Sequence, residues 1–202
     1  MMYSRFNEQN DIFIAVVVLT IAFTLLLNGG LFRINPSSLP IYAITAFAVT
    51  VTAFLLHELA HRTVARRLGA VAYFKLWKMG ILLALLTSLF GFIFAAPGAV
   101  EFAGLYDNKS EGKIALAGPL TNIVLGGIFY IIYLLFNTGV AGFMLYYIAI
   151  LNLWFALFNL LPMPPLDGSK VFYWNSKIFA GIFVFAIILN VVDGFIPSFF
   201  GI

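Results

Sequence analysis

This sequence has no cysteine and very little charge. The 202 residues therefore form no disulfides and offer no thiolate metal ligands. Only 9% of the residues are charged, whereas 63% are hydrophobic. A soluble domain of this size carries far more charge, so the polar residues are too few to cover a globule in water. Most of the chain is therefore expected to lie in a lipid bilayer.

The small excess of basic residues does not indicate a nucleic-acid partner. The formal charge is +3, and the lysines and arginines lie beside apolar segments, where they report the orientation of the chain in a membrane. The first apolar segment, near 12–32, is longer than the roughly 7–15 residues of a signal-peptide core. It also follows Glu8 and Asp11, so we expect it to be a retained span.

Long apolar segments divide the chain into spans, each of which needs roughly 17–25 residues. Four or five segments are long enough, near 12–32, 41–65, 114–136, 141–161 and 178–200. A sixth, 79–96, is shorter and is followed by Pro97, so it is either a short span or a re-entrant segment. The sequence predicts an all-α polytopic membrane protein with five or six transmembrane helices and a re-entrant or short β segment after the second span. It forms one domain over residues 1–202, with its core at 41–170.

Lysine and arginine indicate which ends of the spans face the cytoplasm, because cytoplasmic loops are enriched in them. They follow the second span, precede the span at 114–136 and follow the span at 141–161. These residues are Arg62, Arg66, Arg67, Lys75, Lys78, Lys109, Lys113, Lys170 and Lys177. If all these ends are cytoplasmic, residues 79–96 enter and leave the membrane on one side. The pattern thus favours the re-entrant interpretation.

The second span ends in the sequence HELAH, which places two histidines and a glutamate in apolar surroundings. An acid at the centre of a membrane helix costs roughly 2.5–3.5 kcal/mol on insertion scales, so Glu58 needs a reason to be there. His57 and His61 are four residues apart, so both rings lie on one helical face and can bind one cation. Glu58 lies beside them, where it can take a proton from a water molecule activated by zinc. The pattern predicts a metalloprotease site with one zinc ion.

An isolated HExxH pattern also arises by chance, and histidines near helix ends often only pack or cap. The metal-site interpretation gains weight here because His57 and His61 are the only two histidines in the chain. A catalytic zinc normally takes three protein ligands. Without cysteine or a third histidine, the third ligand should be a carboxylate.

The acids near the N-terminus and in the solvated stretch YDNKSEGK are poor candidates for this ligand, whereas Glu101 and Asp193 remain open. Asp167 is favoured by its setting, NLLPMPPLDGSK, because three prolines break a helix at membrane depth and allow the chain to turn an aspartate inward. It also lies on the same predicted side of the membrane as HELAH. An aspartate before glycine is, in itself, also an ordinary turn.

Three sequence blocks together resemble the site-2 protease family of intramembrane metalloproteases. They occur in the family's order and are HELAH at 57–61, GPLTN at 118–122 and NLLPMPPLDG at 159–168. The resemblance implies that Asp167 is the third zinc ligand. It also implies that Asn159 lies by the active site and binds an extended substrate or the developing oxyanion. Asn122 is expected either to contribute to substrate binding or to hold two helices together.

The resemblance implies a zinc metalloendopeptidase that cleaves peptide bonds in or near transmembrane segments. The lysine and arginine pattern predicts that its site lies towards the cytoplasm. The expected partners are transmembrane protein substrates and the lipid bilayer. The stretch 74–104 is expected to clamp the substrate as an edge strand or membrane loop, or else to serve only in helix packing. The alternative function is a non-enzymatic zinc-binding membrane protein, namely a transporter, a sensor or an inactive scaffold. A transporter would line a path with ionisable groups through several spans, whereas this sequence concentrates them at one level.

Overall fold

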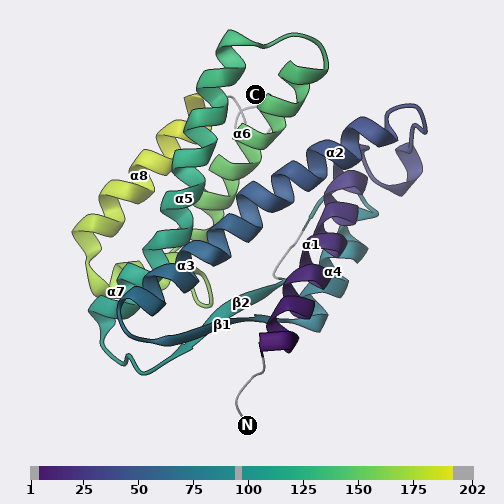
Figure 1. Cartoon of the computed structure of the whole chain (residues 1–202). Helices are drawn as coiled ribbons and strands as arrows, with labels where there is room; N and C mark the ends of the chain where they lie inside the picture. Colours follow the sequence, from purple (N-terminus) through teal and green to yellow (C-terminus); the bar gives the residue numbers. More distant parts are fainter. Residues whose placement is uncertain (1–4, 94–96, 193–202) are drawn as a thin grey trace.

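The computed structural model describes residues 5–93 and 97–192 (Figure 1). Most of these residues are helical, and one small sheet lies at the end of the helices where α3 ends and α1 and α5 begin. The helices are α1 (Arg5–Leu27), α2 (Leu39–Val49), α3 (Leu56–Arg67), α4 (Lys78–Ser88), α5 (Asn108–Leu135), α6 (Gly139–Asn159), α7 (Asp167–Trp174) and α8 (Ser176–Val192). The strands are β1 (Val71–Leu76) and β2 (Gly98–Ala103).

Within the described residues, four helices are long and apolar enough to cross a membrane, which confirms the predicted all-α polytopic fold. They are α1, the continuous helix from α2 through α3, α5 and α6, and they match the first four predicted spans. Helix α8 is described over 17 residues and covers most of the fifth. The remainder of that predicted span, 193–200, lies outside the described residues. Between α2 and α3, residues Thr50–Leu55 form a π-helical segment directly before HELAH. Such segments are frequent at functional sites.

Residues 79–93, the described part of the stretch 79–96, lie between the two strands in the chain. Helix α4 has 11 residues, about 16 Å at 1.5 Å per residue, which is too short for a hydrocarbon core of about 30 Å. Strands β1 and β2 pair antiparallel, from Val71 opposite Ala103 to Leu76 opposite Gly98. Just beyond the last pair, the Trp77 N–H donates to the Pro97 carbonyl at 2.9 Å. The chain therefore leaves and returns at one point, as the re-entrant interpretation requires.

Two acids at the start of α1 hold the outer edge of β1. The Phe74 N–H donates to Glu8 Oε1 at 3.0 Å, and the Leu76 N–H donates to Asp11 Oδ2 at 2.8 Å. Both N–H groups point away from β2, so they would otherwise be unpaired at the strand edge. Glu8 is buried and also pairs with Arg62 Nε of α3 at 3.2 Å. Helix α1 is thereby tied to the sheet and to the helix that carries HELAH.

Replacing Glu8 with alanine should destabilise the protein by about 1–3 kcal/mol, because a buried N–H group loses its only charged acceptor and Arg62 loses its ion pair. Gln9→Ala is the matched control, since Gln9 is exposed on the same helix turn. Thermal unfolding of the two purified variants in one detergent would measure the difference. Equal melting temperatures would show that Glu8 does not stabilise the sheet.

Candidate metal centre and catalytic cleft

Three ligand atoms from two separate parts of the chain meet inside the protein. The Nε2 atoms of His57 and His61 on α3 are 2.9 Å apart. Asp167 Oδ2, from the first residue of α7, lies 3.3 Å from His57 Nε2 and 3.1 Å from His61 Nε2. Ligands placed tetrahedrally at about 2.0–2.1 Å from zinc are about 3.3 Å from each other. The triangle of these three atoms thus has the size of one face of a zinc coordination shell.

The hydrogen bonds behind the two rings determine which nitrogen faces this triangle. His61 Nδ1 lies 2.7 Å from the Ile114 carbonyl oxygen, which can only accept, so Nδ1 carries the proton. His57 Nδ1 lies 2.6 Å from Asn122 Oδ1. The Asn122 Nδ2 group already donates to the Ala53 carbonyl at 2.9 Å, which orients the amide oxygen towards His57. In the neutral rings, both Nε2 atoms therefore present lone pairs.

Two lone pairs and a carboxylate oxygen that converge in a buried place repel one another unless a cation lies between them. The donor set of two imidazoles and one carboxylate is one that zinc uses in catalytic sites, and it leaves a coordination position open. His57, His61 and Asp167 could therefore hold a metal ion, and their arrangement fits zinc.

Gly118 on α5 keeps the space in front of the two histidines open. A Cβ atom on this residue would clash with the Nε2 atoms of both His57 and His61. The next residue, Pro119, lies inside α5 and removes one helical hydrogen bond there. The block GPLTN thus provides both the close approach of α5, through its glycine, and the amide behind His57, through Asn122.

Asp167 reaches the histidines because the start of α7 packs closely against the end of α6. Gly168 allows this approach, since a Cβ atom there would clash with the carbonyls of Leu160 and Leu161. The proline-containing turn between α6 and α7 reverses the chain before Asp167.

The structure places the other open candidate, Glu101, at the rim of the cleft, where it contacts Lys75 Nζ and Tyr73 Oη, each at 3.0 Å. The hydrogen bond that Lys75 donates to Glu101 raises the pKa of Lys75. Asp193 lies outside the described residues.

Glu58 faces the sheet from the same turn of α3. Its Oε2 accepts the Val100 N–H of β2 at 3.1 Å, and its side chain lines a cleft of about 770 Å³ together with both histidines and Asp167. The cleft is bounded by the edge of β2 on one side and by the end of α6 and the turn before Asp167 on the other. The glutamate is therefore beside the ligand triangle and open to the cleft.

The two predicted asparagines occupy different places. Asn159 lines the cleft, and its Nδ2 donates to the Phe155 carbonyl at 3.0 Å. Asn122 was predicted to bind substrate or to join helices, and the structure places it behind His57 with no exposed surface. Its hydrogen bonds to Ala53 on the π-helical segment and to Asn152 on α6 join three helices. In this structure Asn122 thus contacts a candidate ligand instead of the cleft.

Asn152 is a residue that sequence reasoning missed. Its Oδ1 accepts from Asn122 at 3.1 Å, and its Nδ2 donates to Thr52 Oγ1 at 2.9 Å. It is fully buried and fixes the amide that in turn fixes His57. The available signal was an asparagine in the middle of a long apolar span, where an unpaired polar group is costly.

Comparison with known proteins identifies several relatives, although no family model and no solved structure matches. The chain is 43% identical over 182 residues to "Putative zinc metalloprotease MJ0611" of Methanocaldococcus jannaschii, covering 87% of this chain and 90% of that protein. It is 32% identical over 163 residues to "Putative zinc metalloprotease YwhC" of Bacillus subtilis, covering 69% and 71%. A match to "Putative zinc metalloprotease Rip3" of Mycobacterium tuberculosis is 35% identical over 130 residues, covering 61% of this chain and 29% of that protein.

The fold and the site define a polytopic membrane protein with a buried His-His-Asp group suited to a metal ion. The relatives then identify the family: the chain belongs to the site-2 protease family of zinc metalloproteases. The resemblance carried by the three sequence blocks is thereby confirmed.

Gly118→Ala should abolish zinc binding while leaving the helices folded, because the added methyl group occupies the space in front of both Nε2 atoms. Gly127→Ala is the matched control, since a Cβ atom at this position of α5 meets nothing within 4 Å. Zinc content per protein by atomic emission, with helicity by circular dichroism, would measure the effect. Full zinc content in Gly118→Ala would contradict the placement of the ion.

Asn122→Leu should weaken zinc binding by about 10–100-fold, because His57 loses the acceptor that orients its ring. Competition with a zinc chelator would report the affinity. Thr121→Val is the control, since Thr121 bonds only within its own helix, to the Ala117 carbonyl. The interpretation fails if both variants bind zinc as tightly as the unmodified protein.

Proposed function

We propose that this chain is an intramembrane zinc endopeptidase that hydrolyses peptide bonds in or near the transmembrane segments of other membrane proteins. The observation that carries the proposal is the position of Glu58, which lies beside a buried three-ligand site and faces a cleft between membrane-spanning helices. A purely structural metal site would be closed by a fourth protein ligand and would need no such acid.

In the proposed reaction, His57, His61 and Asp167 would hold one zinc ion, which would supply Lewis-acid polarisation of the scissile carbonyl and of the attacking water. Glu58 takes the proton of the water and later delivers it to the leaving amine. The cleft supplies access for water at membrane depth, since it extends to the charged rim that contains Lys75 and Lys170.

The edge of β2 is the proposed binding surface for the substrate backbone. In the antiparallel register, Val100 lies opposite Phe74, and its N–H points away from β1 towards Glu58. The backbone groups of Gly98 and Phe102 alternate with the paired positions and face the same way. All three residues line the cleft. An extended substrate segment can add there as a third strand, with Asn159 on the opposite wall.

In this mode of binding, the substrate changes the hydrogen bonding of Glu58. A substrate carbonyl that accepts the Val100 N–H replaces Glu58 at that donor. Glu58 is then free to contact water. Locally unwound segments are favoured substrates for the same reason, because a helical backbone has no N–H or C=O groups to offer to a strand edge.

The site is proposed to face the cytoplasm. The basic residues in the last turns of α3, in β1, in the first turns of α5 and on α7 are all at the end of the helices where the sheet and the site lie (Figure 1). Cytoplasmic ends of spans are enriched in lysine and arginine.

Glu58→Gln should retain zinc but lose cleavage of a model membrane substrate by about 10²–10⁴-fold, because glutamine can neither take nor deliver the proton. Purified protein in proteoliposomes with a single-span substrate would give the rate, and metal analysis would give the zinc content. Retained cleavage would contradict the role of Glu58. Zinc flux into the same proteoliposomes without cleavage by the unmodified protein would favour transport instead.

Asp167→Ala should lower the zinc content, because only the two imidazoles would remain at the site. Glu101→Ala is the control, since this acid was the other candidate ligand within the described residues and lies at the rim. Loss of zinc in the Glu101 variant with full zinc in the Asp167 variant would exchange the two assignments.

A further inference from the structure

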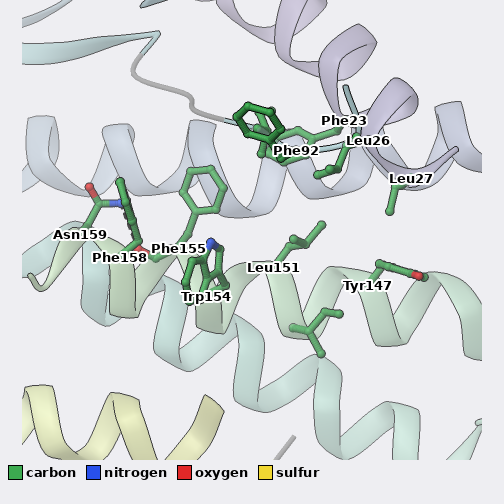
Figure 2. A pocket seen from close by; sticks show the side chains of 13 residues that line it. Phe23, Leu26, Leu27, Phe92, Tyr147, Leu151, Trp154, Phe155, Phe158 and Asn159 are labelled. Atoms are coloured by element: carbon green, nitrogen blue, oxygen red, sulfur yellow. Dashed lines mark hydrogen bonds between the residues drawn. The ribbon is translucent and has the colours of Figure 1, made fainter. Parts of the chain in front are cut away.

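A second cavity, of about 410 Å³, lies between α1 and α6 (Figure 2). Helix α6 lines it from Tyr147 to Asn159, a distance of about 18 Å at 1.5 Å per residue. Figure 2 shows Phe23, Leu26 and Leu27 of α1 opposite these residues. The lining is almost entirely aromatic and aliphatic, so the cavity is an apolar groove along one face of α6.

The groove adjoins the catalytic cleft at one end. Phe155, Phe158 and Asn159 line both the groove and the cleft, so the two spaces share a wall over the last turns of α6. The other end of the groove, at Leu27 and Tyr147, lies deeper along the two membrane-spanning helices. The apolar lining therefore extends from within the membrane-spanning helices to Asn159, at the wall of the cleft.

The far wall of the groove is held in place by a backbone contact. The Leu31 N–H donates to the Leu89 carbonyl at 2.8 Å, which joins the end of α1 to the end of α4. Gly30 has φ +88°, and a Cβ atom there would clash with the backbone of Leu89 and Gly91. This contact sets Gly91 and Phe92 against the α1 side of the groove. The groove is thus built by the re-entrant segment as well as by two spans.

We infer that this groove holds one face of the apolar, still helical part of a transmembrane substrate, whose chain unwinds past Asn159 and continues into the cleft along β2. The inference rests on the proposed function and deepens it. A helix is about 10–12 Å across, so 18 Å of it has several times the volume of the groove. Only the side chains on one helical face therefore enter, and the opposite face stays in lipid.

A lipid acyl chain is the other apolar occupant, and the wall that the groove shares with the cleft argues against it. The groove ends at a polar amide, Asn159, which an acyl chain cannot hydrogen-bond but an unwound peptide can. The groove also adjoins the cleft that contains the strand edge proposed to bind the unwound residues. A substrate occupying both has a helical part of about 12 residues alongside the stretch of α6 from Tyr147 to Asn159, by the same rise per residue.

The absence of cysteine from the chain makes this arrangement testable by disulfide cross-linking. The probe is a synthetic peptide with a 20-residue leucine-alanine core, an Asn-Gly pair near one end and one cysteine either about 10–12 or about 2–3 residues from that pair. The protein carries Glu58→Gln, which keeps the peptide intact, together with one of Leu27→Cys, Tyr147→Cys or Phe158→Cys. Ile21→Cys is the control, because Ile21 lies on the lipid-facing side of α1 and does not line the groove.

We expect the distant peptide cysteine to cross-link at positions 27 and 147, and the near one at position 158, each at least about tenfold faster than at position 21. Leu27 and Tyr147 lie on opposite walls, so misfolding of one variant still leaves the other. Equal rates at positions 21 and 27, or rates independent of the place of the peptide cysteine, would overturn the inference. So would a lipid that native mass spectrometry finds bound and that the peptide fails to displace.

The outcome separates this inference from the proposed function, because cross-linking needs no cleavage. If the unmodified protein cleaves membrane substrates but the groove positions do not cross-link, the groove assignment is wrong. If the position-dependent pattern appears and no cleavage is found, the groove binds a membrane segment and the proposed hydrolysis is wrong.

Discussion

Two hydrogen-bond acceptors behind the imidazoles, the Asn122 amide oxygen and the Ile114 carbonyl, determine how the rest of the site is arranged. They keep the proton on Nδ1 of each ring, so the Nε2 lone pairs of His57 and His61 point at each other and at Asp167. Both acceptors come from α5, whereas the histidines come from α3. The packing of α3 against α5 is therefore inseparable from the chemistry of the site, and a shift of either helix would change which atoms face the metal position.

The packing of the helices around the site in turn depends on glycines at two positions where elements approach closely. Gly118 allows α5 to pass directly in front of the histidines, and Gly168 allows α7 to pass under the end of α6. Helices in lipid gain little from burying apolar surface against each other, so close contact and internal hydrogen bonds carry more of the association. The chain Asn122–Asn152–Thr52 supplies such bonds across α5, α6 and the π-helical segment.

The sequence predicted the first four spans and the grouping of His57, His61 and Asp167 because their signals are local. Apolar length gives a span, HELAH gives two rings on one helical face, and prolines give the turn before Asp167. It did not predict the acceptors of Nδ1, since Ile114 contributes only a backbone atom. Nor did it predict that Glu8 and Asp11 hold a strand some 65 residues later in the chain. Such partnerships depend on which helices become neighbours, and no spacing within one segment encodes that.

The hydrogen bond between the Trp77 N–H and the Pro97 carbonyl has a consequence for how the sequence of such a protein can vary. Everything between these residues is an insert that starts and finishes at one point of the sheet. Its length is therefore independent of the separation between α3, α5 and α7, on which the zinc geometry depends. Because the same insert builds one side of the apolar groove, its residues would, under the proposed function, change the range of membrane segments that are accepted without displacing the histidines, the aspartate or the glutamate. The proposed recognition and the proposed hydrolysis would then depend on separately adjustable parts of the structure.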